Sequence, residues 1–431
     1  IEIGAGLTGA GDLNFTAANL GTDPLVATII VTPTFTNDGV SCDGPTESFT
    51  ITVNPTAQVD IISDSFVLSG ELTPSISLSS QSTNTTFSWV ASPDADITGL
   101  VNDSGSNSLI PSETFYNFET IPLEVVYVIT PVVNNDLAGI SCPGTTYTYT
   151  VIVNPSASVK SIEDLIVCNE DSVSVLFTSE NTGGTVTYAW TSDIEIGAGL
   201  TGAGDLNFTA ANLGTDPLVA TIIVTPTFTN GGVSSDGPTE SFTITVNPTA
   251  QIDAITSQVL CNNEVTEIVE FTTQNTVGIT TYTWTNDSPS IGLLATGNGD
   301  ITSFTAINLG TEPLVATIIV TPTFTNDGAS CVGPTESFTI TVNPTAQVET
   351  PVDQVVCNEE ATTVLFTTEN TDGVTAYAWT SDIEIGAGLT GAGDLSFTAI
   401  NLGTDPLVAT IIATPTFTND GVGCVGPTES F

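Results

Sequence analysis

The stretch "PLVATIIVTPTF", residues 24–35, has apolar side chains at every second position of its first half. One face of it carries Leu25, Ala27, Ile29 and Val31. A period of two with one apolar face is typical of a half-buried β-strand, whereas an amphipathic helix repeats about every 3.6 residues. The later stretch "SFTITV" (48–53) alternates Phe, Ile and Val with Thr in the same way. Both stretches predict an all-β fold.

Internal repetition divides the chain into units of domain size. The tripeptide Val-Asn-Pro recurs with its Pro at 55, 155, 248 and 344, and residues 1–37 return unchanged at 194–230. We therefore expect five segments: unit 0 (1–54), unit 1 (55–154), unit 2 (155–247), unit 3 (248–343) and unit 4 (344–431). Unit 0 lacks the front half of a repeat, and unit 4 ends inside what should be its last strand. The chain is thus expected to be a stretch of a longer head-to-tail array.

Each complete unit is predicted to be an immunoglobulin-like β-sandwich of about seven strands. Turn residues punctuate the units every 8 to 12 residues, and Thr, Val and Ile are abundant. Each front half holds an aromatic-x-Trp pair on a predicted central strand, with Trp89, Trp190, Trp284 and Trp379. We interpret these Trp residues as core residues, with sugar binding as the alternative. Within the strands like 24–35, a bulge or an end of pairing is expected at Pro33, Pro226, Pro322 and Pro415.

Several motifs in each unit form a recognisable series. A "VCNEE" or "LCNNE" segment precedes "TYTWT", a Gly-rich stretch, "PLVATIIVTPTFTNDG", a Cys-x-Gly and "FTITVNP". This series resembles the PKD-like immunoglobulin-like repeats of very large surface proteins of gliding bacteria, although the Trp-Asp-Phe-Gly-Asp-Gly signature of better-known PKD domains is missing. The resemblance implies export by the type IX route and a role as an adhesin or filament.

Composition excludes several classes of function. The chain has 48 acidic residues, a single basic residue (Lys160), no His, and a formal net charge of −47. Nucleic acid and anionic membranes are excluded as partners because binding phosphate requires Lys and Arg. No apolar run is long enough to span a bilayer. Since neither an imidazole base nor a phosphate clamp is available, we predict no enzymatic activity, no catalytic residues and no cofactor-binding residues.

The cysteines fall at two positions of the repeat. The early position holds Ser69, Cys168, Cys261 and Cys357, and the late position holds Cys42, Cys142, Ser235, Cys331 and Cys424. If each early position pairs with the late position of the following unit, no Cys faces a Ser. Pairing early with late inside one unit, or late with the early position of the next unit, leaves a Cys facing a Ser in two of four pairs. This register predicts the disulfides Cys168–Cys331 and Cys261–Cys424, and it places the partners of Cys42, Cys142 and Cys357 outside the chain.

Topology favours the same register. In a sandwich of strands about ten residues long, the two positions of one unit lie roughly 30 to 40 Å apart, while a disulfide requires Cα atoms within about 7 Å. Head-to-tail stacking brings the bottom of one unit to the top of the next. Pairing within a unit or between chains stays open as the alternative. Because Ser69 would face Ser235, the joint between units 1 and 2 is predicted to be the most compliant.

Acidic residues flank the same positions. Stacking is expected to bring Glu170 and Asp171 to Asp327, and Glu264 to Asp420, in a chain with almost no cations. Clusters of carboxylate oxygens suit Ca²⁺, so these five residues are candidate calcium ligands at two successive joints. The alternative is that they are solvated turn residues.

These observations favour a non-enzymatic structural segment of a long extracellular filament or giant cell-surface adhesin. The repeats would form a stiff rod that bears load, bundled with other copies of the same chain, between the cell and a distal tip that binds an unknown surface or glycan. Two alternatives are kept. In the first, the repeats themselves are glycan- or surface-binding adhesin modules; in the second, they are the spacer region of a secreted hydrolase.

Overall fold

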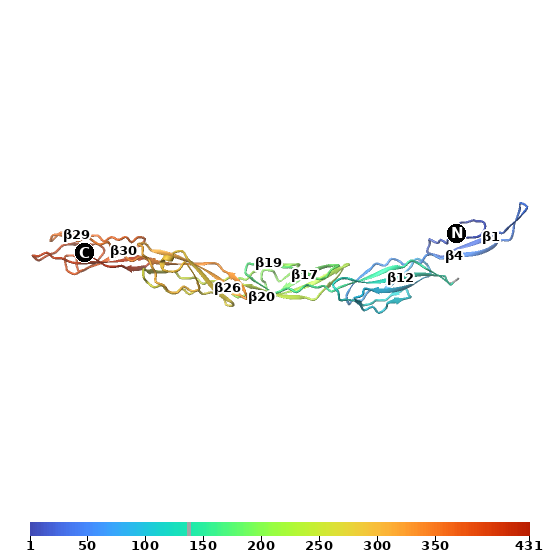
Figure 1. Cartoon of the computed structure of the whole chain (residues 1–431), viewed down its shortest axis with the longest axis horizontal. Helices are drawn as coiled ribbons and strands as arrows, with labels where there is room; N and C mark the ends of the chain where they lie inside the picture. Colours follow the sequence, from blue (N-terminus) through green and yellow to red (C-terminus); the bar gives the residue numbers. More distant parts are fainter. Residues whose placement is uncertain (136–138) are drawn as a thin grey trace.

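The computed structural model describes residues 1–135 and 139–431, and the units follow one another end to end as an extended rod (Figure 1). In the described residues the only helical element is one 3₁₀ turn, η1 (Pro289–Ile291), and no helix there is long and apolar enough to cross a membrane. The predicted all-β architecture of tandem immunoglobulin-like sandwiches is confirmed.

Unit 2 shows the plan of a repeat. Its larger sheet has the strand order β15-β22-β20-β17-β18, with β21 pairing on β20, and its smaller sheet pairs β16 with β19. Strand β15 runs parallel to β22, and the other pairs are antiparallel. The strands are β15 (Leu165–Cys168), β16 (Ser172–Val175), β17 (Thr185–Ser192), β18 (Thr201–Ala203), β19 (Leu206–Thr209), β20 (Leu218–Asn230), β21 (Val233–Asp236) and β22 (Glu240–Asn247).

The other units are variations on this plan. Unit 0 contains β1 (Leu25–Val31), β2 (Thr34–Asn37), β3 (Val40–Asp43) and β4 (Glu47–Val53). Unit 1 contains β5 (Ser65–Leu68), β6 (Ile76–Ser77), β7 (Thr85–Pro93), β8 (Ile97–Thr98), β9 (Ser104–Gly105), β10 (Leu109–Ile110), β11 (Tyr116–Asn117), β12 (Leu123–Asn135), β13 (Ile140–Pro143) and β14 (Tyr147–Asn154).

Unit 3 keeps the strand order of the larger sheet, whereas the larger sheet of unit 4 has no first parallel strand. Unit 3 contains β23 (Gln258–Cys261), β24 (Ile279–Asn286), β25 (Thr296–Asn298), β26 (Leu314–Asn326), β27 (Ala329–Val332) and β28 (Glu336–Asn343). Unit 4 contains β29 (Ala361–Val364), β30 (Val374–Ser381), β31 (Thr390–Ala392), β32 (Leu395–Thr398), β33 (Ile411–Asn419), β34 (Val422–Val425) and β35 (Glu429–Ser430).

The long strand β20 explains why unit 2 has eight strands and not the expected seven. It pairs with β22 as far as Val224 and with β21 from Thr227 onward, so its last residues form a hairpin beyond the end of the neighbouring strand β22. Pro226 lies at this changeover. Its carbonyl oxygen accepts a hydrogen bond from the Gly237 N–H at 2.9 Å. Proline has no backbone N–H, and at Pro226 the nitrogen faces β21 and β22 and not β17. Pairing with β17 therefore continues across Pro226.

The period of two places the core as the sequence predicts. On β20 the side chains of Ala220, Ile222 and Val224 are fully buried, while Ile223 between the last two is 42% exposed. The four Trp residues are 3–7% exposed, and Trp190 lies on β17 between β18 and β20. The backbone of Gly202 on β18 lies directly against the Trp190 ring, where a Cβ would come within 2.2 Å of a ring carbon. A close approach of this kind accounts for one glycine of the run "GAGLTGAGD".

Candidate functional site at the joints between units

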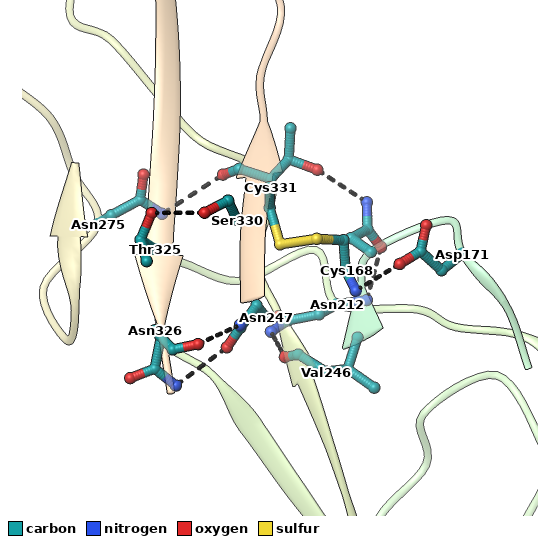
Figure 2. Close-up of a disulfide and its surroundings, with 12 residues drawn as sticks. Cys168, Asp171, Asn212, Val246, Asn247, Asn275, Thr325, Asn326, Ser330 and Cys331 are labelled. Carbon is teal, nitrogen blue, oxygen red and sulfur yellow. Dashed lines mark hydrogen bonds between the residues drawn. A yellow bond between two sulfur atoms is a disulfide. The ribbon is translucent and has the colours of Figure 1, made fainter. Parts of the chain in front are cut away.

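The hairpin that extends from each long strand meets the preceding unit. In unit 3 it joins β26 to β27 through Asp327 and Gly328, with φ of +48° and +85°. Two consecutive residues at positive φ form the tight turn that matches the twist of paired strands. The tip contacts the preceding unit near Asn247, at the end of β22, and brings β27 against β15 (Figure 2). Three kinds of contact occur at the joints, and the joints between units 2 and 3 and between units 3 and 4 have all three.

The first contact is covalent. Cys168 at the end of β15 is bonded to Cys331 on β27, and Cys261 at the end of β23 is bonded to Cys424 on β34. In both pairs the Cα atoms are 5.5 Å apart and the sequence separation is 163 residues. These are the two pairs that the mismatch-free register predicts. Each bridge links a unit to its successor, because parallel pairing carries the early strand to the same end of the sandwich as the last strand.

The position assigned to Ser69 in the sequence is wrong by one residue. Cys168 pairs with Asn247 in the parallel ladder, and in unit 1 it is Leu68 that pairs with the equivalent Asn154. Ser69 takes the place of Asn169 instead, since its hydroxyl accepts the Asn117 N–H at 2.9 Å. At this joint the two positions that carry the disulfide elsewhere are therefore occupied by Leu68 and Ser235. Without a Cys to anchor the alignment, sequence comparison could not fix the register of this turn.

The second contact is a pair of asparagines at every complete joint. Asn247 of the Val-Asn-Pro link is fully buried; it donates to the Asn326 carbonyl oxygen at 3.2 Å and accepts from the Asn326 side-chain amide at 3.1 Å. The pairs Asn154–Asn230 and Asn343–Asn419 repeat both bonds. Sequence reasoning assigned the link to Pro and missed the Asn. The available signal was that an Asn precedes every link Pro and another ends every long strand.

The third contact comes from the loop before the Trp-bearing strand. The Asn275 amide of unit 3 donates to the carbonyl oxygens of Thr215 in unit 2 and of Thr249 in the link, at 3.2 and 3.4 Å. Asn370 makes the same pair of bonds to Thr311 and Thr345 at the next joint. Each joint is therefore held on more than one side of the link, which restricts bending in more than one direction.

The candidate calcium ligands have other roles in the structure. Asp171 and Glu264 accept the N–H of Cys168 and Cys261, each at 2.8 Å, and so close the turn after the early strand. Glu170, with φ of +72°, belongs to the same turn, while Asp327 and Asp420 occupy hairpin tips. All five side chains belong to exposed residues. Across 1–135 and 139–431, no group of three or more His, Cys, Asp or Glu residues is placed to hold a metal ion.

The three other cysteines are not disulfide-bonded within the chain. Cys42 and Cys357 are exposed, and Cys142 is partly buried at the joint between units 0 and 1. There the Asn54 amide donates to the Cys142 sulfur at 3.6 Å. Asn54 belongs to the first Val-Asn-Pro link, so Cys142 occupies the same kind of joint as Cys331.

The structure thus defines a tandem array of immunoglobulin-like β-sandwiches with bonded joints. Residues 62–157, which cover most of unit 1, match the family model of the PKD-like domain. No curated protein matches the chain. Solved structures that match the chain include four cadherin domains of Drosophila N-cadherin (12% identity, 82% of this chain, 93% of that chain, TM-score 0.26). Another is protocadherin gammaB7 EC3–6 (12% identity, 87% of this chain, 99% of that chain, TM-score 0.28). A third is Sidekick-1 immunoglobulin domains 1–4 (12% identity, 88% of this chain, 98% of that chain, TM-score 0.24).

Proposed function

We propose that this chain is a load-bearing structural segment of a long extracellular filament or giant cell-surface adhesin of a bacterium, exported by the type IX route. The observation that carries the proposal is the pair of disulfides that join successive units over 163 residues each. Disulfides persist in oxidising, extracellular surroundings, which supports the location. Catalysis is no part of this role.

The bridges give tension a short covalent path. Force that reaches Cys168 along the first strand of unit 2 crosses to Cys331 and leaves unit 3 along β28, so residues 169–330 carry none of it. From Cys331 to Cys357 is 26 residues, which extend to at most about 90 Å. One unit is as long as its 13-residue strand β26, about 44 Å at 3.4 Å per residue. These 26 residues run from the start of unit 3 to the far end of unit 4, about 88 Å over two units, so the covalent path is almost taut in the folded array.

Charge supports an extended, soluble array. A net charge of −47 with a single Lys, whose ion pair with Glu180 is exposed, repels neighbouring chains along most of their surface. Association with other copies of the same chain, which we propose for the filament, would use the uncharged Thr-rich outer faces of the larger sheets. Calcium at the joints is a separate proposal and would add to stiffness.

Pulling between two handles tests the load path. With handles at positions 156 and 345 of the full chain, the oxidised protein should show no unfolding step, because only 26 residues separate the handles through Cys168–Cys331. Reduction should release the loop in steps totalling on the order of 500 Å. The Cys168→Ser/Cys331→Ser variant, never exposed to reductant, is the matched control and should extend like the reduced protein. Equal extension before and after reduction would contradict the proposal.

A glycan-binding role for the repeats is favoured by one observation in unit 1. Tyr116 and Phe118 are 43% and 79% exposed, and their rings are nearly parallel with centroids 6.2 Å apart. Exposed parallel rings can stack on the apolar face of a sugar. Binding of oligosaccharides by the intact chain, lost in Tyr116→Ala/Phe118→Ala, would support this second function. Absence of binding across a broad glycan panel would count against it.

A further inference from the structure

The joint between units 1 and 2 differs from its neighbours at four matched positions. Where the next joint has Cys168 and Cys331, this one has Leu68 and Ser235. The other two positions are Phe66 on β5 and Gly231 at the tip of the following hairpin. By their pairing with the last strand, Ile166 and Val259 take the place of Phe66 in units 2 and 3. Asp327 and Asp420 take the place of Gly231.

The Phe66 ring lies directly against Gly231. A Cβ at Gly231 would come within 2.1 Å of two ring carbons, far closer than atoms can approach. Gly231 also has φ of +60°; the neighbouring hairpins carry Asp at this position with φ of +48°, and the residue equivalent to Phe66 in the units before them is a smaller Ile or Val. The strands that carry these residues, β5 and β21, are in contact across the joint. Phe66 therefore fits a hairpin with glycine at this position and clashes with the Asp-bearing tips of units 3 and 4.

We infer that units 1 and 2 are joined by a thiol-free interface in which Phe66 packs on Gly231 in place of a disulfide, and that this match determines which unit can follow which. The interface consists of aromatic and backbone contacts together with the Asn154–Asn230 bonds, so reducing agents do not open it. The array then contains two kinds of joint, one covalent and one held only by packing and hydrogen bonds. This inference concerns assembly and does not depend on the proposed load-bearing role.

A double-substitution cycle in the full chain tests the match. Fluorophores on unnatural amino acids at the exposed Thr148 and Thr187 report the distance distribution between units 1 and 2. Gly231→Asp should broaden this distribution, because the Asp side chain and the Phe66 ring cannot share the space. Phe66→Ile/Gly231→Asp, which copies the neighbouring joint, should narrow it again. An unchanged distribution in Gly231→Asp, or a double variant broader than either single one, would overturn the inference.

Two further measurements separate the interface from general unfolding. Fluorescence of Trp89 and Trp190 should be unchanged in every variant, since both rings lie in the cores and away from the joint. Reductant should leave the distribution of fluorophore distances between units 1 and 2 unchanged. It should broaden the distance distribution of a similar pair of fluorophores placed on units 2 and 3. Equal broadening at both joints would contradict a thiol-free interface.

Cysteine trapping tests the position of the lost bridge. In the Phe66→Ile/Gly231→Asp background, adding Leu68→Cys and Ser235→Cys should produce a disulfide that peptide mapping detects without reductant. Ser69→Cys with Ser235→Cys should give none, because Ser69 belongs to the turn that follows. The opposite outcome would overturn the assignment of Leu68 to the joint.

Discussion

A single buried amide defines each joint at the residue scale. Asn247 is fully buried and exchanges two hydrogen bonds with Asn326 of the next unit. An amide can both donate and accept in this way, whereas a carboxylate can only accept. The link residue thus recognises the hairpin of its successor by chemistry that Asp cannot reproduce at neutral pH.

Replacing that amide should weaken the joint. Asn247→Ala removes both bonds to Asn326 in a partly buried site, while the bond from the Asn326 amide to Asp327 remains, and this loss costs about 1–3 kcal/mol of unfolding free energy. Denaturant unfolding followed by Trp284 fluorescence measures the loss. Asn14→Ala, at an exposed position of unit 0, is the control and should stay within about 0.5 kcal/mol of the wild type. A joint variant as stable as this control would show that the paired bonds contribute nothing.

Acid should loosen the first strand of unit 2. The backbone N–H of Thr243 donates to Asp164 at 2.6 Å, and this bond lowers the pKa of Asp164 below its usual 3.8. A lowered folded-state pKa gives stability that is complete above pH 3.8 and is lost as the pH falls through the folded value. In unit 3 the Ser257 hydroxyl accepts the equivalent Thr339 N–H.

The variant Asp164→Ser copies unit 3 and should remove this part of the pH dependence. Hydrogen exchange at the Thr243 amide, compared between pH 6 and pH 3, should accelerate more in the wild type than in the variant after correction for intrinsic rates. Identical acceleration in both proteins would indicate that Asp164 does not anchor the strand.

At the scale of elements, the alternation in residues 24–35 was enough to predict the strands, the buried face and the central position of Trp190. The disulfide register followed from which positions lack Cys. The change of partners at Pro226 agrees with the end of pairing expected there, whereas period two alone does not predict that the hairpin of β20 and β21 protrudes toward the preceding unit. The Asn pairs depend on contacts between units, which leave no periodic signal within one unit. The Leu68 position depends on the strand register within unit 1, which no Cys marks in the sequence. The sequence places acids beside the joints but does not give the direction of their side chains, so the calcium site stays a prediction.

The edge strand β18 should not tolerate a side chain at Gly202. A Cβ there would lie 2.2 Å from the Trp190 ring, so Gly202→Ala forces the ring or the strand to move. Overpacking of this kind costs about 1–3 kcal/mol, measurable as a lower denaturation midpoint for unit 2. Gly9→Ala, where nothing lies within 4 Å of the added Cβ, is the matched substitution and should be neutral. Equal midpoints for the two variants would refute the contact.

At the scale of the whole molecule, joint chemistry varies along the rod. Bending at single joints in electron micrographs should be widest between units 1 and 2, where no disulfide joins the two units. If Ca²⁺ stiffens the acid-bearing joints, a chelator should lower the melting temperature and widen bending between units 2 and 3. It should leave the joint with Gly231 unchanged, which makes that joint an internal control. Unchanged melting and persistence length would end the calcium proposal.

The overlapping bridges also bear on survival after damage. Residues 169–330 lie in the loop closed by Cys168–Cys331, and residues 262–423 lie in the loop closed by Cys261–Cys424. A protease that cuts the backbone once inside either loop leaves the two fragments covalently attached, and a cut at 262–330 is spanned twice. The oxidised array is therefore a chain that one backbone nick cannot sever over this region, a property suited to a structure that cannot be repaired once it has left the cell.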